Sequence, residues 1–175
     1  MMLIGDIGNT DTKICLLNSN YKIVKRLTLS TRKINMLFLQ RKINFLINKK
    51  IKINTSLFCS VVPEKFFLIK SFLKKKYKIH SIELKKLKLD KLMKIKVSKK
   101  QVGSDRLANS IALASLKKNY IVLDFGTATT FDVLFGNVYK GGVIAPGIKL
   151  SLNNLINKAS LIPDVNLKKM KKVIG

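Results

Sequence analysis

The chain has 175 residues, 47% of them hydrophobic, which is enough to bury the core of one or two α/β lobes. Its formal net charge is +26, but only four of the 35 basic residues are arginines, and the lysines are spread over the whole chain rather than gathered in a nucleic-acid-binding motif. No apolar run reaches the roughly 18 to 20 residues needed to span a bilayer, and "MMLIGDIGNT" lacks the basic start of a signal peptide. The composition therefore favours a cytoplasmic protein with no membrane partner and no specific nucleic-acid partner.

The expected elements alternate between strands and helices, which indicates an α/β fold. Cys15, Cys59 and the single His80 lie apart from one another without ligand spacing, so we expect reduced thiols and no Cys/His metal site. In chain order, the pattern predicts strands at 2–7, 12–17 and 21–29, a helix at 32–48, a strand at 57–62, a helix beginning at Pro63, an ambiguous charged stretch at 80–100, a helix in "SDRLANSIALASLKK" and a further strand from residue 119.

The pattern of the N-terminus begins again at residue 119. With a constant offset of 118, Asp6 aligns with Asp124, Gly8 with Gly126 and Thr12 with Thr130. Each copy reads as strand, glycine-hydroxyl turn, strand, turn, strand. A repeated supersecondary unit predicts two related lobes, at 1–118 and 119–175.

The two glycine-hydroxyl turns suggest phosphate chemistry. Backbone N–H groups and hydroxyls at such turns form a donor-rich surface for phosphate oxygens, and a carboxylate at a strand end can hold the cation that accompanies them. Lys13 could add a positive charge. Two facing hairpins would clamp a nucleotide's phosphates. The alternative is that Asp and Thr only cap local turns.

Asp105 and Arg106 form a third candidate in "QVGSDRLANSIAL". A carboxylate in the first turn of a helix can simply interact with the helix dipole. The functional interpretation is a general base at the mouth of the inter-lobe cleft, beside an arginine that grips an anionic substrate.

Several stretches together resemble type III pantothenate kinases over essentially the whole chain. They are "DIGNTDTK", "SVVP", "VGSDRLAN", "DFGTATTFDV", "GGVIAPGIKLS" and "LIPDVNL…VIG". The resemblance implies the actin-like fold of acetate kinases, sugar kinases, Hsp70 and actin, with duplicated ribonuclease-H-like lobes. It also implies ATP-dependent phosphorylation of pantothenate, the first step of coenzyme A synthesis, by a cytoplasmic homodimer that needs Mg²⁺ (or Mn²⁺) and K⁺ or NH₄⁺.

The resemblance also implies a role for each matching residue. Asp105 is the expected catalytic base, and Asp124 is the expected ligand of the monovalent cation. The first phosphate loop comprises Asp6, which also arranges the divalent metal, with Gly8, Asn9, Thr10 and Lys13; the second comprises Gly126, Thr127, Thr129 and Thr130; the pantothenate site comprises Gly103, Ser104, Asp105 and Arg106.

Two departures from the family pattern leave more than one function open. The segment before Gly103 is "KIKVSKKQ", where the family usually has an Asn-Pro and an upstream aromatic residue, so the pocket could take another small hydroxylated acid. Family members also continue for several tens of residues beyond "VIG", which predicts an incomplete second lobe. The chain could then be a catalytically impaired remnant, or a non-enzymatic binding or transcription-accessory protein of the same family.

Overall fold

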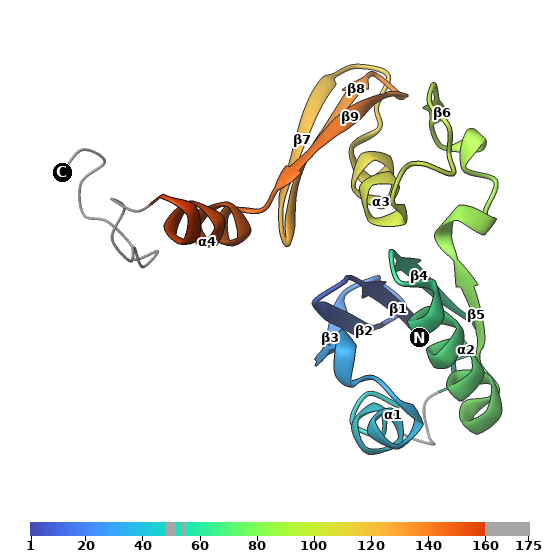
Figure 1. Cartoon of the computed structure of the whole chain (residues 1–175). Helices are drawn as coiled ribbons and strands as arrows, with labels where there is room; N and C mark the ends of the chain where they lie inside the picture. Colours follow the sequence, from blue (N-terminus) through green and yellow to red (C-terminus); the bar gives the residue numbers. More distant parts are fainter. Residues whose placement is uncertain (48–51, 54, 160–175) are drawn as a thin grey trace.

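The computed structural model describes residues 1–47, 52–53 and 55–159. The chain forms two β-sheets, one above the other in Figure 1, with helices packed on and between them. In chain order the elements are β1 (Met2–Ile7), β2 (Asp11–Leu17), β3 (Ile23–Ser30), η1 (Thr31–Lys33), α1 (Met36–Ile43), β4 (Thr55–Ser60), α2 (Pro63–Tyr77), β5 (His80–Glu83), η2 (Leu84–Lys86), η3 (Leu89–Lys91), β6 (Lys94–Ile95), α3 (Ser104–Leu113), β7 (Asn119–Phe125), β8 (Ala128–Phe135), β9 (Val138–Pro146) and α4 (Ile148–Lys158).

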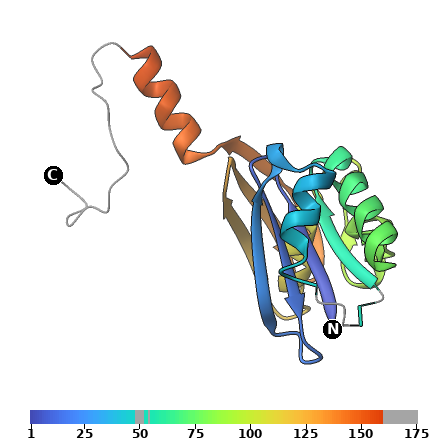
Figure 2. The same ribbon diagram turned by 90° about the horizontal axis from the view of Figure 1, so that it is seen from below.

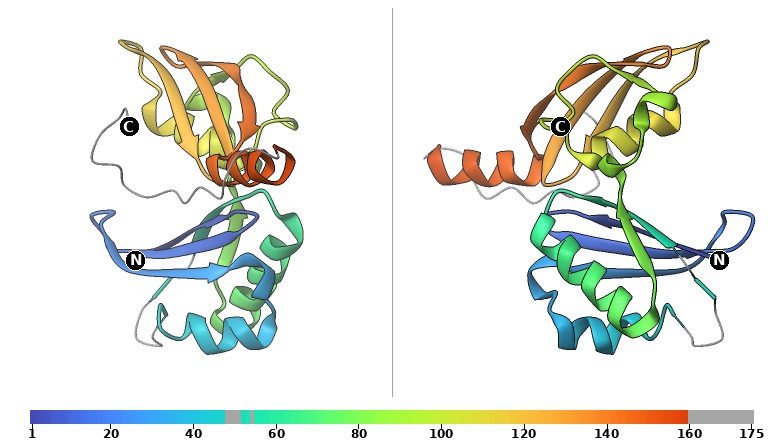
Figure 3. Two further views of the ribbon diagram at one scale, coloured as in Figure 1. Left: turned by 60° about the vertical axis from the view of Figure 1, so that its left-hand side comes forward. Right: turned by 90° about the vertical axis from the view of Figure 1, so that its right-hand side faces the viewer.

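The first sheet has the strand order β3-β2-β1-β4-β5. Strands β1 to β3 form an antiparallel meander, whereas β4 and β5 run parallel to β1. Figure 3 shows α1 and α2 on the same face of this sheet. The core between the sheet and these helices includes Leu3, Ile14, Leu39 and Ile69, all completely buried. The opposite face of β1 is therefore left to meet the second lobe, and it carries Asp6.

The helix predicted at 32–48 is shorter in the structure. Residues 31–33 form the 3₁₀ helix η1, and α1 begins only at Met36. The side chain of Asn35 accepts a hydrogen bond of 2.9 Å from the backbone N–H of Phe38, so Asn35 is the N-cap that starts the helix. Leu39 and Ile43 of α1 are completely buried, and both ends of the predicted helix lie outside the observed ones.

The second sheet has the order β6-β9-β8-β7, and its two faces differ. The inner face contributes Leu134 and Tyr139, both fully buried, to a core that also includes Leu107 of α3. On the outer face, the cross-strand neighbours Leu123, Phe131 and Val143 are 48%, 36% and 66% exposed. The outer face is thus an open apolar surface among the described residues.

Helix α4 follows β9 and points away from both lobes. Figures 1 and 2 show it projecting from the end of the second sheet. None of its residues is buried. Its packing against the described part of the chain is correspondingly slight, and it takes no part in either core.

The structure confirms the duplication but corrects its alignment. The register shift between Leu16 and Leu17 in the β2–β3 pairing recurs between Val133 and Leu134 in the β8–β9 pairing, an offset of 117 (133 minus 16). The strand registers then give offsets of 118 for β1 onto β7 and 116 for β3 onto β9. The second copy is one residue shorter at each hairpin turn. Thr12 therefore corresponds to Thr129, and both are buried, whereas the constant offset of 118 wrongly paired Thr12 with Thr130.

The second lobe begins before residue 119 in the structure. Strand β6 pairs with β9, and the second core includes Leu84, Leu89 and Met93. Both features lie within the predicted first lobe, 1–118. We therefore propose a lobe boundary near residue 84, where the chain leaves β5, in place of the predicted boundary at 118–119.

Candidate active site

The predicted site residues gather in one cleft between the two lobes. The cleft has a volume of about 540 Å³ and lies where the tips of the β1–β2 and β7–β8 hairpins meet the start of α3. Twelve of the fourteen predicted residues line it: Asp6, Gly8, Asn9, Thr10, Lys13, Gly103, Asp105, Arg106, Asp124, Gly126, Thr127 and Thr130.

The two hairpin tips are equivalent and touch each other. The N–H of Gly8 donates to the Asp11 carbonyl at 3.0 Å, and the N–H of Gly126 donates to the Ala128 carbonyl at 2.9 Å. The hydroxyl oxygens of Thr10 and Thr127 lie 2.9 Å apart, within hydrogen-bond distance. Two glycine-hydroxyl turns therefore face each other across the cleft, which is the arrangement that a shared phosphate site requires.

Four carboxylates line the cleft around these turns: Asp6, Asp11, Asp105 and Asp124. The Asp6 residue as a whole is exposed, but neighbouring atoms desolvate its carboxylate. This desolvation raises the pKa of Asp6, the charges of Asp105 and Asp124 raise it further, and Lys13 opposes them. Among the described residues, no three His, Cys, Asp or Glu side chains approach closely enough to hold a metal ion by themselves. A cation here would have to share its coordination with a ligand such as phosphate.

The start of α3 is fixed by short local contacts. The buried Ser104 hydroxyl accepts a hydrogen bond from the Ser60 N–H at 2.6 Å and donates to the Ser60 carbonyl at 3.0 Å. The Asp105 carboxylate accepts from the Arg106 N–H at 2.8 Å. A Cβ on Gly103 would meet a carboxylate oxygen of Asp105, so a larger residue there would displace that carboxylate.

Two predicted residues do not line the cleft. The hydroxyl of Ser104 is used to join α3 to the end of β4. Thr129 is buried and, by strand alternation, lies on the face of β8 opposite to Thr130. Their roles in ligand binding stay predictions.

Thr130 is placed differently from its neighbour. Its hydroxyl is buried at the wall of the cleft and has no hydrogen-bond partner within the part of the chain that the structure describes. A buried hydroxyl without a partner costs free energy, and a ligand oxygen in the cleft would remove that cost.

Arg106 is held more tightly than the sequence predicted. Its Nε donates to both carboxylate oxygens of Asp132, at 3.0 and 3.1 Å, and its Nη2 lies 2.7 Å from Oδ1. The guanidinium therefore already has one carboxylate partner inside the protein, although Arg106 also lines the cleft.

The sequence interpretation missed two polar residues around the site. Asp132 pairs with Arg106, and Asn109 donates to the Asp124 carboxylate at 3.1 Å from the second turn of α3. The signal for Asp132 was present: it is an acid in the apolar strand "TFDVLF", on the same face as the buried Leu134. The Asn109 contact depends on how α3 lies against β7 and has no local signal.

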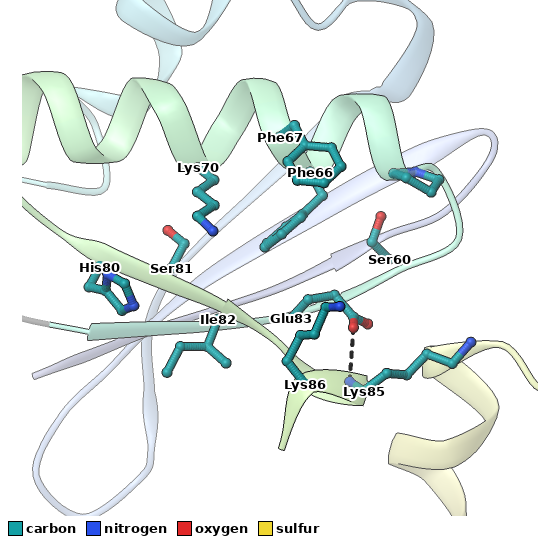
Figure 4. A pocket seen from close by; sticks show the side chains of 11 residues that line it. Ser60, Phe66, Phe67, Lys70, His80, Ser81, Ile82, Glu83, Lys85 and Lys86 are labelled. Atoms are coloured by element: carbon teal, nitrogen blue, oxygen red, sulfur yellow. Dashed lines mark hydrogen bonds between the residues drawn. The ribbon is translucent and has the colours of Figure 1, made fainter. Parts of the chain in front are cut away.

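A second cavity lies away from these residues, between α2 and β5 (Figure 4). It has a volume of about 380 Å³ and is lined by Phe66, Phe67, Lys70, Glu83 and other residues of α2, β4, β5 and η2. None of the predicted site residues lines it. We therefore assign the candidate chemistry to the inter-lobe cleft.

Two duplicated lobes with facing glycine-hydroxyl turns define an actin-like α/β fold. A crystal structure of a putative Baf family transcriptional activator from Campylobacter jejuni superposes on 97% of this chain with a TM-score of 0.56, covering 68% of that protein at 21% identity. At that identity the similarity concerns the fold alone.

Sequence comparison identifies the family. The model of the type III pantothenate kinase family matches residues 2–175. The chain is 61% identical over all 175 residues to a type III pantothenate kinase of Pelagibacter ubique, covering 71% of that protein. It is 32% identical to one of Desulforapulum autotrophicum, covering 70% of it. The chain belongs to the type III pantothenate kinase family.

Proposed function

We propose that this chain transfers the γ-phosphoryl group of ATP to the primary hydroxyl of pantothenate, the first step of coenzyme A biosynthesis. Family membership supports the reaction, and one structural observation supports its location. The two glycine-hydroxyl hairpins meet in the cleft that also holds Asp105. Phosphate donors and a carboxylate base are thereby presented to the same volume.

Asp105 is the proposed general base. The pantothenate hydroxyl oxygen forms a bond to the γ-phosphorus, the bond from that phosphorus to the β-bridging oxygen breaks, and the hydroxyl proton passes to the Asp105 carboxylate. ADP then leaves with the electron pair of the broken bond. A well-placed general base contributes about 10²- to 10⁴-fold to such a rate.

The two hairpin turns are the proposed phosphate sites. Gly8, Asn9 and Thr10 belong to one turn, Gly126 and Thr127 belong to the other, and all five line the cleft. Positioning and neutralisation of charge supply most of the rate in phosphoryl transfer, because the protein does little covalent chemistry. Lys13 and the unpartnered Thr130 hydroxyl support this assignment, since both could interact with phosphate oxygens.

A kinase of this family uses a divalent metal with ATP, and we propose Mg²⁺ or Mn²⁺ at Asp6 and K⁺ or NH₄⁺ at Asp124. The residues fit cations, because positive charge would offset the desolvation of Asp6 and the repulsion from Asp105 and Asp124, which together raise its pKa. When bound, such ions neutralise charge on the phosphates. Asn109 orients the Asp124 carboxylate.

We further propose a cytoplasmic homodimer. The exposed row Leu123, Phe131 and Val143 supports an association surface on the second sheet, because contiguous exposed apolar side chains mark interaction sites. No helix among the described residues is long and apolar enough to cross a membrane. The dispersed lysines give no support to a specific nucleic-acid partner.

Another small hydroxylated acid is the second candidate substrate. The unusual segment "KIKVSKKQ" before Gly103 motivates it. In the structure, β6 of this segment pairs with β9, and Val97 lies against Gly141.

The test is pantothenate-dependent release of ADP by the purified chain with Mg²⁺ and K⁺. Asp105→Asn is expected to lower the rate by at least about 10²-fold, in keeping with the loss of a general base. Asp90→Asn is the matched control, since Asp90 lies outside the cleft with its side chain 79% exposed. Omission of Mg²⁺ and replacement of K⁺ by Na⁺ test the two cations separately. A folded chain that releases no ADP with pantothenate would contradict the proposal, and a panel of other hydroxy acids would then test the second candidate.

A further inference from the structure

Asp132 is a buried acid that the reaction as described does not use. It is only 1% exposed, and it accepts hydrogen bonds from Arg106 Nε through both of its oxygens. Arg106 itself is 7% exposed. This buried ion pair, in which one N–H is shared between both carboxylate oxygens, joins α3 to β8 at the inner face of the second sheet.

Tyr139 completes the arrangement from the neighbouring strand. Its side chain is fully buried, and its hydroxyl donates to Oδ1 of Asp132 at 2.5 Å. Burial raises the pKa of the Tyr139 phenol, and the hydrogen bond and charge of Asp132 raise it further, so the group remains a proton donor. The hydrogen bond and charge of Asp132 also outweigh the burial of Arg106 and raise its pKa, so the guanidinium remains charged.

The strand β9 makes room for these contacts at Gly142. A Cβ at that position would lie 2.5 Å from Arg106 Nη2 and 2.8 Å from Oδ1 of Asp132. The residue is paired with Asp132 across the two strands. The absence of a side chain at Gly142 therefore lets the backbone approach the ion pair directly.

An ion pair buried in this way is a poor means of adding stability. Removing two charges from water is costly, and apolar residues of similar volume often replace a buried pair without loss. What the arrangement does provide is a single orientation of the guanidinium. Arg106 follows the proposed base Asp105 in the chain, and it lines the cleft.

We infer that Asp132 and Tyr139 are positioning residues, which hold the guanidinium of Arg106 so that it recognises the anionic group of the substrate. The inference rests on the proposed function, in which that group is the carboxylate of pantothenate. Asp132 and Tyr139 act through Arg106 and do not touch the substrate themselves. Their removal should therefore affect recognition of the charge more than the chemical step.

The kinetic test compares pantothenate with pantothenol, in which a primary alcohol replaces the carboxylate. The wild-type chain is expected to favour pantothenate in kcat/KM. Asp132→Asn should reduce that preference at least 10-fold through KM, with a smaller change for pantothenol, and Tyr139→Phe should reduce it about 3-fold. An equal loss for both substrates, or an unchanged preference, would overturn the inference, because a merely structural role does not depend on the substrate's charge.

A second readout does not depend on turnover. The chain has four arginines, so the Nε–H signals in a ¹H–¹⁵N spectrum are few, and Arg106→Lys identifies the one of interest. Pantothenate is expected to shift the Arg106 signal in the wild-type chain, whereas pantothenol should not, and Asp132→Asn should abolish the shift. The other three arginine signals serve as internal controls.

The two readouts separate the two claims. If the chain shows this charge-dependent shift but releases no ADP, the proposed reaction fails and the positioning role stands. If it releases ADP while pantothenate leaves the Arg106 signal unchanged, the positioning role fails. Should Asp132→Asn not fold, Tyr139→Phe, which removes only one hydroxyl, decides the question by the same two measurements.

Discussion

Replacing Gly142 with alanine tests how closely β9 passes the buried ion pair. The added Cβ would lie 2.0 Å from the Phe131 carbonyl oxygen, 2.5 Å from Arg106 Nη2 and 2.8 Å from Asp132 Oδ1. The first of these atoms belongs to the backbone of the adjacent strand, and the other two are held in the ion pair. Overpacking of this kind costs about 1 to 3 kcal/mol. If the strand shift also separates the pair, the loss rises to about 3 to 5 kcal/mol, because a charge is left buried alone.

The assay is urea unfolding followed by circular dichroism, with Gly126→Ala as the matched control. A Cβ on Gly126 would meet only the Ala128 carbonyl oxygen, at an ordinary 3.6 Å, so its free energy of unfolding should change by less than about 0.5 kcal/mol. Gly142→Ala should also weaken the preference for pantothenate over pantothenol. A Gly142→Ala chain as stable as the control would refute the close approach of β9 to α3.

Three further predictions concern the cleft and its surroundings. Asp6→Asn should raise the melting temperature of the ligand-free chain at pH 7, because the raised pKa of Asp6 means that its ionised form costs stability above that pKa. The gain in free energy of unfolding should be below about 1 kcal/mol, because Asp6 is partly exposed and solvent screens its charge. It should shrink as the pH falls towards 3.8, the ordinary pKa of the group. Thermal unfolding at several pH values measures this gain, and a destabilised variant would contradict the prediction. Thr10→Ala should change the free energy of unfolding by about 1 kcal/mol or less but raise KM for ATP, because it removes the hydroxyl that meets Thr127 at the hairpin tips; an unchanged KM would place the phosphates elsewhere. Desolvation, with a smaller contribution from Asp6, raises the pKa of the Cys59 thiol from 9.0 to about 12. Because the thiolate is the reactive form, iodoacetamide at pH 8 should alkylate Cys59 at least about 100-fold more slowly in the folded than in the unfolded chain. Peptide mass spectrometry gives that rate, and equal rates in the two states would show that the thiol is not desolvated.

The local elements and the cleft could be predicted from the sequence because their signals are short in range. Short apolar runs define β1 and β2, and the turn around Gly8 is recognisable from its composition. The same pattern after residue 119 revealed the duplication. Its alignment was wrong by one and two residues beyond the first strand, because the shortened turns of the second copy cannot be seen without the strand registers.

Contacts between distant segments were decided only by the tertiary structure. From the sequence alone, Asp6 and Asp124 were placed at the ends of strands that lead into glycine-hydroxyl turns, and Asp105 was placed in the first turn of a helix. The sequence also showed that the two strand-and-turn patterns are copies of one unit. It did not determine that Ser104 serves as a link to β4, or that Arg106 is already bound to Asp132. Those outcomes depend on how α3 packs between two sheets, where burial requires each polar group to find a partner. Which side chains remain free for a ligand is therefore a property of the packed chain, and no local pattern encodes it.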